Sequence, residues 1–256
     1  MQAKEFVSHG IPVTQVQVET EQDEKVLARA RGRYITLELG PLTQLLDFEG
    51  ACACLVEQLK PLMEPYFGKS LCVCGMGNPD MPSDSLGPET GKRFQPHMYD
   101  IFAERSNFEK IAVVCPGTSA LTNLATETIV SGVVSAMGAA CVVAVDSSVT
   151  KDAAMLCAAI HLADSGIENQ GKTAHLCQTT VGVPVIAVVV PTAISAVATS
   201  DDGAGEKGLL LAPVQVADTI SIASFIIACA IAQIAYPELD YESCKQYIGL
   251  TLHGVI

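Results

Sequence analysis

Two segments near the N-terminus alternate apolar and polar residues. The first covers residues 10–18 and alternates from Val13 onward, and the second covers residues 34–39. Successive side chains of a strand point to opposite faces, so this alternation predicts half-buried strands. A charged turn and an arginine-rich stretch lie between the two segments. We therefore expect a pair of neighbouring antiparallel strands at the N-terminus.

The middle of the chain has a different pattern. Short continuous apolar runs, bounded by Gly, Pro or Asp, are typical of fully buried strands. These runs cover residues 71–74, 111–115, 141–145, 158–163 and 183–190. Helices are expected over residues 42–65, 84–94, 123–137 and 214–235. Buried strands that alternate with helices predict an α/β fold with a mostly parallel sheet covered on both faces.

The domain count follows from length and continuity. The chain has 256 residues, which suits one large α/β domain. It shows no internal repeat and no low-complexity linker. We expect a single domain over residues 1–256.

Charge and composition exclude some functions. The formal net charge is -13, whereas a non-specific nucleic-acid binder needs a basic surface. Residues 1–6 lack an apolar signal region, so we expect no export. Residues 219–237 carry no charge but include Ser221, Ser224 and Gln233. Their length is marginal for a membrane span, and we expect a buried core helix and no membrane partner.

The cysteines give little support for a metal site. Ten are scattered along the chain, and buried free thiols in a reducing compartment are the simplest interpretation. Cys72 and Cys74 lie two apart on a predicted strand, so they share a face. Zinc-type Cys-x-x-Cys spacing is missing from the sequence.

A glycine turn and two aspartates suggest chemistry. The run 71–74 ends in Gly75-Met-Gly77-Asn, and a Pro/Asp/Ser loop then leads to Asp84, where we expect a helix to begin. Glycines allow the backbone to turn sharply there. The run 141–145 ends in Asp146. Ligands and catalytic groups gather at the carboxyl ends of strands in open parallel sheets.

Two carboxylates so placed could share a proton, because like charges at close range cannot both ionise cheaply. One would then activate water while the other protonates the leaving group or polarises the carbonyl. Alternatively the pair could hold a divalent metal, with His161 or Asp164 as third ligand. A histidine in an apolar strand is more often structural, and an aspartate at a strand end is often a helix cap.

Other catalytic motifs are weak. Gly75-x-Gly77 is half a dinucleotide fingerprint, but Asp80 occupies the third glycine position and the Walker lysine is missing. The sequence also lacks a Gly-x-Ser-x-Gly elbow. Nucleotide binding and serine hydrolysis are therefore not favoured.

Several motifs occur together in a fixed order. They are Gly-Ile-Pro-Val-Thr at 10–14 with 34–38, Gly-Met-Gly-Asn at 75–78 with Asp-Ser-Leu-Gly-Pro at 84–88, Pro-Gly at 116–117 with 121–122, and residues 129–134, 143–146, 160–167, 182–187 and 191–192. On these motifs the chain resembles the germination protease family of endospore-forming bacteria, over nearly its whole length.

The resemblance implies a fold similar to the hydrogenase maturation proteases, a three-layer α/β/α sandwich. It implies an aspartic endopeptidase that cleaves small acid-soluble spore proteins during germination, without a cofactor, in the cytoplasm of the forespore or spore core, as a homo-oligomer. Asp84 and Asp146 match the two aspartates on which the family depends. Further residues are expected to shape or support the site: Gly75, Gly77, Asn78, Asp164 and Lys151.

The sequence departs from the family pattern around this site. Residues 1–9 contain no counterpart of the family's activation segment, so we expect either synthesis without a proform or a different form of regulation. Ala125 stands where the family has Glu, Lys151 follows the second aspartate where the family has Arg, and the loop at 168–172 is short. An Arg-to-Lys change keeps a cation but not a bidentate one.

These departures leave three functions open. The first is an aspartate-dependent endopeptidase. The second is a metal-guided maturation peptidase with Asp84, Asp146 and His161 near the ion. The third is a catalytically degenerate member that binds a spore or cell protein without cutting it.

Overall fold

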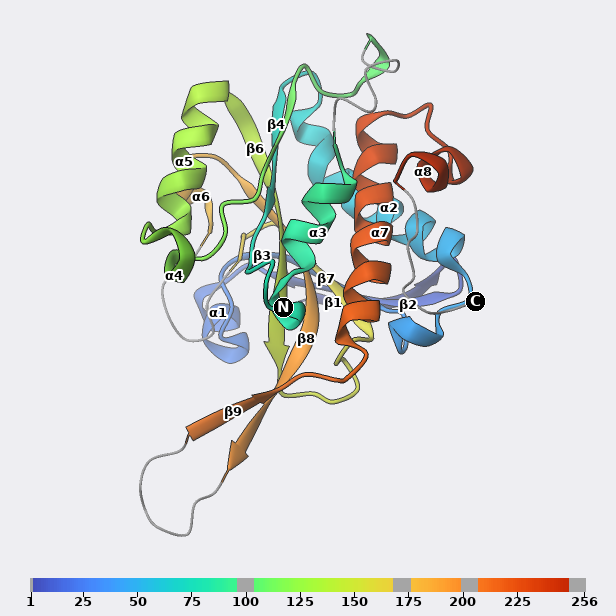
Figure 1. Ribbon diagram of the computed structural model, residues 1–256, viewed down its shortest axis with the longest axis vertical. Coiled ribbons are helices and arrows are strands. Elements are labelled where there is room, and N and C mark those ends of the chain that lie inside the picture. Colours follow the sequence, from blue (N-terminus) through green and yellow to red (C-terminus); the bar gives the residue numbers. More distant parts are fainter. Residues whose placement is uncertain (1, 96–103, 168–175, 199–206, 249–256) are drawn as a thin grey trace.

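A single nine-stranded sheet with helices on both faces forms the body of the protein (Figure 1). The computed structural model describes residues 2–95, 104–167, 176–198 and 207–248. The strand order is β1-β2-β3-β7-β8-β6-β4-β5, and β9 pairs with β8 outside this path. The β8–β9 hairpin projects away from the body in Figure 1.

The elements have the following bounds. The strands are β1 (Gln2–Ser8), β2 (Ile11–Val18), β3 (Gly32–Glu38), β4 (Ser70–Gly75), β5 (Ile111–Val114), β6 (Ala139–Thr150), β7 (Ala159–Ala163), β8 (Val185–Ala198) and β9 (Lys207–Leu211). The α-helices are α1 (Glu21–Leu27), α2 (Phe48–Met63), α3 (Leu86–Arg93), α4 (Ser119–Thr122), α5 (Thr126–Met137), α6 (Gln178–Val181), α7 (Val216–Ala235) and α8 (Tyr241–Ile248). Short 3₁₀ turns are η1 (Leu42–Gln44), η2 (Glu64–Tyr66) and η3 (Pro82–Asp84).

The sheet has a parallel half and an antiparallel half. Strands β8, β6, β4 and β5 are parallel neighbours. Strands β1, β2, β3 and β7 join them through antiparallel pairs, and β7 meets β8 antiparallel. The α/β class with a large helix-covered sheet is confirmed, but the parallel arrangement is confined to the half that contains β4 and β6. The expected N-terminal pair is part of this same sheet.

The N-terminal region contains two elements that the pattern did not predict. β1 pairs along β2 at the edge of the sheet, and its side chains are mostly exposed, so it shows no alternation of buried positions. α1 buries only Asp23 among its seven residues. A capping box with Thr20 starts this helix, so local hydrogen bonds rather than apolar periodicity define it.

Alternate residues of the central strands contact the two helical layers. Leu71 and Val73 of β4 belong to a large apolar cluster that includes α2, α3, α7 and α8. Cys72 and Cys74 belong to the cluster on the other face, with α5. This confirms that the two cysteines share a face. The parallel half is thus the middle layer of three, and Figure 1 shows the two helical layers on either side of it.

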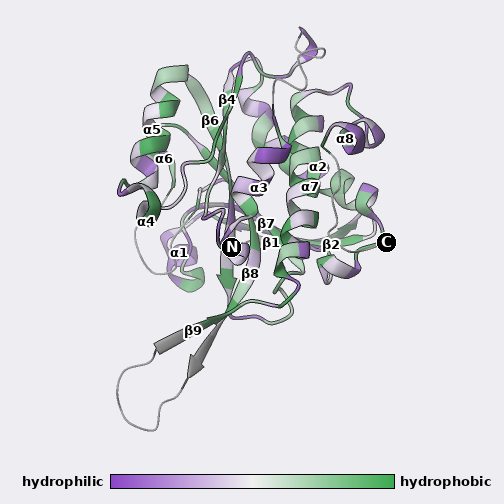
Figure 2. Ribbon diagram, in the orientation of Figure 1, coloured by the Kyte–Doolittle hydropathy of each residue, from purple (hydrophilic) through white to green (hydrophobic). Residues whose placement is uncertain are grey.

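Helix α7 is a core helix. Most of its residues are buried, and its apolar colouring is visible in Figure 2. Among the described residues it is the one helix long and apolar enough to cross a membrane, and 78% of its most apolar window is buried. This burial confirms the prediction of a buried core helix over the segment.

Candidate active site

The site begins where β4 ends and β6 continues. The last residue pair between these strands is Gly75 with Val145, whereas β6 continues beside β8 as far as Thr150. The backbone N–H of Met76 donates to the carbonyl of Val145 at 2.8 Å. The prediction that the strand ends at Asp146 was therefore wrong. Asp146 lies within β6, as its first residue beyond the end of β4.

Asp84 comes from the loop that follows β4. It is the last residue of η3, and α3 begins at Leu86, so the helix expected to start at Asp84 starts two residues later. Oδ2 of Asp84 accepts a hydrogen bond of 2.9 Å from the backbone N–H of Asn78. The Thr192 hydroxyl donates to the carbonyl of Ser83 at 2.6 Å. The loop is thereby closed on itself and fastened to β8.

Glycines allow this loop to approach the strand ends. Gly77 has φ of 117°, and a Cβ atom there would overlap the carbonyl oxygen of Asp84. A Cβ atom on Gly75 would overlap the carbonyl oxygen of Gly87, and one on Gly87 would overlap the backbone of Met76. Because no other residue leaves this space empty, the three glycines fix how closely Asp84 approaches the end of β4.

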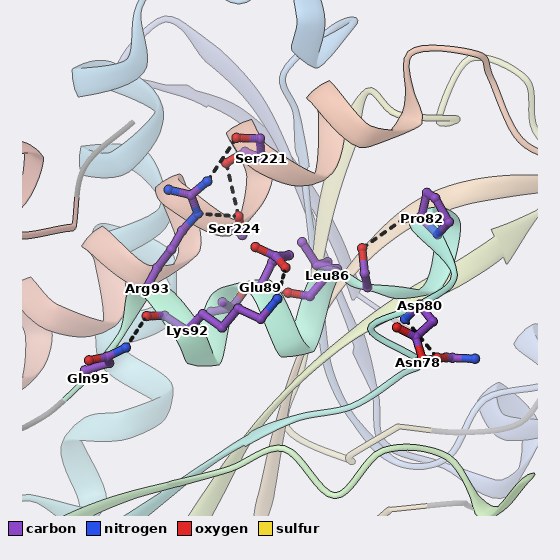
Figure 3. A network of polar contacts seen from close by, with 12 residues as sticks. Asn78, Asp80, Pro82, Leu86, Glu89, Lys92, Arg93, Gln95, Ser221 and Ser224 are labelled. Atoms are coloured by element: carbon purple, nitrogen blue, oxygen red, sulfur yellow. Dashed lines mark hydrogen bonds and ion pairs between the residues drawn. The ribbon is translucent and has the colours of Figure 1, made fainter. Parts of the chain in front are cut away.

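Both ends of α3 are anchored. Its N-terminal end packs on the strand ends through Gly87. At the other end, Nε of Arg93 donates to Oγ of Ser224 at 2.9 Å, and Nη2 donates to Oγ of Ser221 at 2.9 Å (Figure 3). Burial lowers the pKa of Arg93, and the Glu89 carboxylate opposes this shift. These contacts hold α3, and with it the loop of Asp84, against α7.

The two aspartates are electrostatically coupled. Burial, and to a smaller extent the negative charge of Asp84, raise the pKa of Asp146 to about 7, against a hydrogen bond from the Ser147 N–H. Burial also raises the pKa of Asp84, against the hydrogen bond from Asn78. Asp84 ionises while Asp146 is still neutral, so the repulsion acts on the second ionisation. Between the two ionisations the pair holds one proton and one negative charge, and Asp146 is about half protonated at pH 7.

A cleft of about 810 Å³ opens over the face of the sheet on which Asp146 lies. Every residue from Asp146 to Asp152 lines it, together with the C-terminal end of α1. Two cations, Arg29 and Lys151, also line it. Arg29 stacks on the ring of Tyr34 at 4.8 Å, and Lys151 is exposed. The cleft therefore combines a protonatable acid with positive charge, in a protein whose net charge is -13.

His161 lies on the floor of the same cleft. Its Nδ1 is 3.0 Å from the hydroxyl of Thr36 on β3. Burial lowers the pKa of His161 to about 4, and the nearby Arg29 charge contributes, so the ring is neutral at pH 7.

The metal-ligand alternative is not supported by this geometry. Asp84, Asp146 and His161 all belong to the described residues, and within that part of the chain no three His, Cys, Asp or Glu side chains form a group that could hold a metal ion. The proposed ligand set is therefore not assembled.

Asp164 has a structural contact rather than a place in the cleft. It is exposed, and its Oδ1 accepts a hydrogen bond of 2.7 Å from the backbone N–H of Arg33 at the start of β3. Among the described residues that line the cleft, Asp164 does not occur. This contact lies at the junction of β3 and β7, and the expected role of Asp164 as a support of the site stays a prediction.

The sequence comparisons identify the family. The sequence model of the germination protease family matches residues 1–205. The chain belongs to the germination protease family. It is 27% identical to the germination protease of Priestia megaterium over 216 residues, which is 78% of this chain and 57% of that protein. It is 31% identical to that of Oceanobacillus iheyensis over 212 residues, 78% of this chain and 58% of the relative.

The chain spans somewhat more than half the length of these germination proteases. A solved structure, the NiFe hydrogenase maturation protease HycI of Thermococcus kodakarensis, is similar with a TM-score of 0.42 and 17% identity, over 69% of this chain and 97% of that one.

The roles of three residues at the site, Gly87, Arg29 and Tyr34, were not predicted from the sequence. Gly87 lies inside the motif at 84–88, but only its contact with the end of β4 explains the glycine. Arg29 reaches the cleft from the segment between α1 and β3, and Tyr34 reaches it from β3. Tyr34 and Thr36 share a strand face, so alternation within the motif at 34–38 was a signal that could have linked them to His161.

Proposed function

We propose that the protein is an endopeptidase of germination-protease type in which Asp84 and Asp146 together hydrolyse a peptide bond. The observation that carries the proposal is the coupled carboxyl pair beside a cleft, with the pKa of Asp146 raised to about 7 by burial and by the charge of Asp84. Catalytic acids and bases with perturbed pKa values are typical of such sites.

The two carboxyl groups take different roles. Asp146 is the protonated acid at and below about pH 7, because its pKa is raised to about 7. Asp84 is the carboxylate, and the N–H of Asn78 stabilises its charge. The carboxylate of Asp84 removes a proton from water as the water oxygen attacks the peptide carbonyl carbon, and Asp146 protonates the carbonyl oxygen. Collapse of the tetrahedral intermediate breaks the C–N bond: Asp84 gives the proton taken from water to the leaving amine, and a hydroxyl of the intermediate returns its proton to Asp146 as the carbonyl re-forms.

The substrate follows from the family. Its relatives are named germination proteases, which supports small acid-soluble spore proteins as substrates and the spore core or forespore as the place of action. The same resemblance supports a homo-oligomer. The exposed apolar side chains of Leu210 and Leu211 in the projecting hairpin, and of Val214 just after it, support contact between copies.

The test is cleavage of a purified small acid-soluble spore protein, with and without a chelator. Wild type is compared with Asp84→Asn and Asp146→Asn, and with Asp240→Asn, an exposed aspartate that caps α8. We expect each site variant to lose at least about 10³-fold in kcat. Asp240→Asn and the chelator should leave kcat unchanged, and the circular dichroism of every variant should match that of wild type.

Full activity of Asp84→Asn would overturn the assignment. Activity lost on chelation would replace the carboxyl pair by a metal-assisted reaction. Binding of the spore protein without turnover by wild type would favour the degenerate binding protein.

A further inference from the structure

Four residues lie in one row across the sheet. Asp146 of β6 pairs with Val189 of β8, Val189 pairs with His161 of β7, and His161 pairs with Thr36 of β3. Residues paired in this way point to the same face of a sheet. Asp146, Val189 and His161 all line the cleft. The cleft floor thus runs from Asp146 directly to His161.

The two ring nitrogens of His161 differ in their hydrogen bonding. Nδ1 contacts the Thr36 hydroxyl at 3.0 Å. Nε2 has no hydrogen-bond partner among the described residues. It is also absent from the fully buried side-chain atoms of that part of the chain that lack a partner, so it is not completely enclosed by the protein. Since His161 lines the cleft, Nε2 is the atom that a molecule in the cleft can reach.

We infer that Nε2 of His161 binds the main chain of the peptide substrate, a few residues from the bond beside Asp146. The inference rests on the proposed function, because it assumes a peptide in this cleft. It assigns His161 to substrate binding instead of metal binding.

The choice of a peptide main chain follows from the chemistry of a neutral imidazole. Its open nitrogen is a donor in one tautomer and an acceptor in the other. A peptide backbone offers both an N–H and a C=O at each residue, so either tautomer finds a partner. The charged groups that line the cleft with His161 are Arg29 from the α1–β3 segment, Asp146 of β6, and Lys151 and Asp152 just after β6. The pKa of His161, lowered to about 4, keeps the ring neutral beside them.

The spacing fixes where along the substrate this contact falls. Neighbouring strands lie about 4.8 Å apart, so Asp146 and His161, two strands apart, are separated by roughly 10 Å. An extended peptide rises about 3.3 Å per residue. His161 therefore meets the substrate about three residues from the cleaved bond. Thr36 acts as a positioning residue, because its hydroxyl orients the ring.

Two substitutions separate the two ring nitrogens. The amide nitrogen of Asn reaches the place of Nδ1, and that of Gln reaches the place of Nε2. His161→Asn therefore keeps the Thr36 contact and loses the group in the cleft, whereas His161→Gln keeps a polar group in the cleft. Thr36→Val leaves the ring in place but removes its orienting contact.

Binding and cleavage are measured separately. Binding of a fluorescein-labelled small acid-soluble spore protein is measured by anisotropy in the Asp84→Asn background, and cleavage in the otherwise wild-type chain. We expect His161→Asn to raise Kd and KM about tenfold, the effect of one lost hydrogen bond, with kcat unchanged within about twofold. His161→Gln should restore binding to within about threefold of wild type, and Thr36→Val should raise KM without changing kcat.

A shortened substrate provides a second readout. Two shortened peptides end two residues from the cleaved bond, one on each side of it. The peptide that lacks the residues expected to meet His161 should bind equally well to wild type and His161→Asn. A purely structural histidine would give a larger loss for His161→Gln, which gives up the Thr36 contact, than for His161→Asn, and no dependence on peptide length.

The outcomes distinguish this inference from the proposed function. Binding that depends on His161 without any cleavage by wild type would support the inference and reject the proposed catalysis. Cleavage that depends on Asp84 but is insensitive to His161 and Thr36 would do the reverse. If both His161 variants unfold, as shown by their melting curves, Thr36→Val decides: unchanged KM overturns the inference. Absence of any binding also overturns it.

Discussion

Gly77 and Asp84 lie so close together that a Cβ atom on residue 77 would overlap the carbonyl oxygen of Asp84. Gly87 is packed as tightly against the backbone of Met76 and the carbonyl of Val145. Close backbone approach, rather than flexibility, therefore explains both glycines. It also explains how a loop residue is held beside Asp146 of the neighbouring strand.

This packing predicts opposite effects for two helical glycines. Gly87→Ala inserts a methyl group where backbone atoms already lie, so we expect it to destabilise the fold by about 2 kcal/mol or more and to abolish cleavage. Gly132 of α5 has open space around it, and Gly132→Ala should stabilise the protein by about 0.5–1 kcal/mol through helix propensity. Urea unfolding of both variants checks this. Equal free energies of unfolding for the two variants would show that Gly87 is not in close contact with the backbone of Met76.

The coupling of the aspartates predicts a pKa change that is measurable by NMR. Removing the charge in Asp84→Asn should lower the pKa of Asp146 below its value of about 7. The pKa should stay above 3.8, because burial is the larger cause of the shift. Titration of the ¹³Cγ resonance of Asp146 measures it directly. An unchanged pKa would mean that the two carboxyl groups do not interact.

The sequence predicted the elements whose residues are both buried and bounded by turn-forming glycines. Continuous apolar runs predicted β4 and β6, and the glycine turn after β4 pointed to Asp84. The pattern failed where local or edge interactions dominate. α1 depends on the Thr20 cap, and β1 is an exposed edge strand, so neither has an apolar period.

The position of Asp146 shows a second limit. β6 does not end there, because polar residues after Val145 continue to pair with β8, and pairing is a property of two strands that one segment does not reveal. Two cleft partners of Asp146, Arg29 and Tyr34, were missed because they come from distant segments, and His161 was named only as a possible metal ligand. His161 reaches the row of Asp146 only through the register of β7, β8 and β6.

The raised pKa of Asp146 predicts how stability depends on pH. The native state favours the protonated form, so this stabilisation is fully present below pH 3.8, the ordinary value, and is lost as the pH rises through about 7. The shift from 3.8 to about 7 corresponds to roughly 4 kcal/mol at 1.36 kcal/mol per unit. Asp146→Asn does not titrate, so it should be more stable than wild type at pH 8 by up to about 4 kcal/mol and similar to it at pH 3.5.

Chemical denaturation at the two pH values measures this difference. Glu109→Gln, which changes an exposed carboxylate, is the matched control and should leave the pH dependence of wild type unchanged. A constant difference between Asp146→Asn and wild type from pH 3.5 to pH 8 would mean that Asp146 is not shifted in the folded protein.

Asp164 provides a test of structural support against catalysis. Its carboxylate accepts the hydrogen bond from the Arg33 N–H, and its Oδ1 occupies the space beside Gly32. Asp164→Ala removes the acceptor at an exposed position where water replaces it, so the expected cost is about 0.5–1 kcal/mol. Asp164→Asn keeps an acceptor oxygen and should cost less.

Because neither variant changes the cleft, kcat should stay within about twofold of wild type. A large loss of kcat in Asp164→Ala at native stability would instead show that this carboxylate supports the catalytic pair, as expected from the sequence.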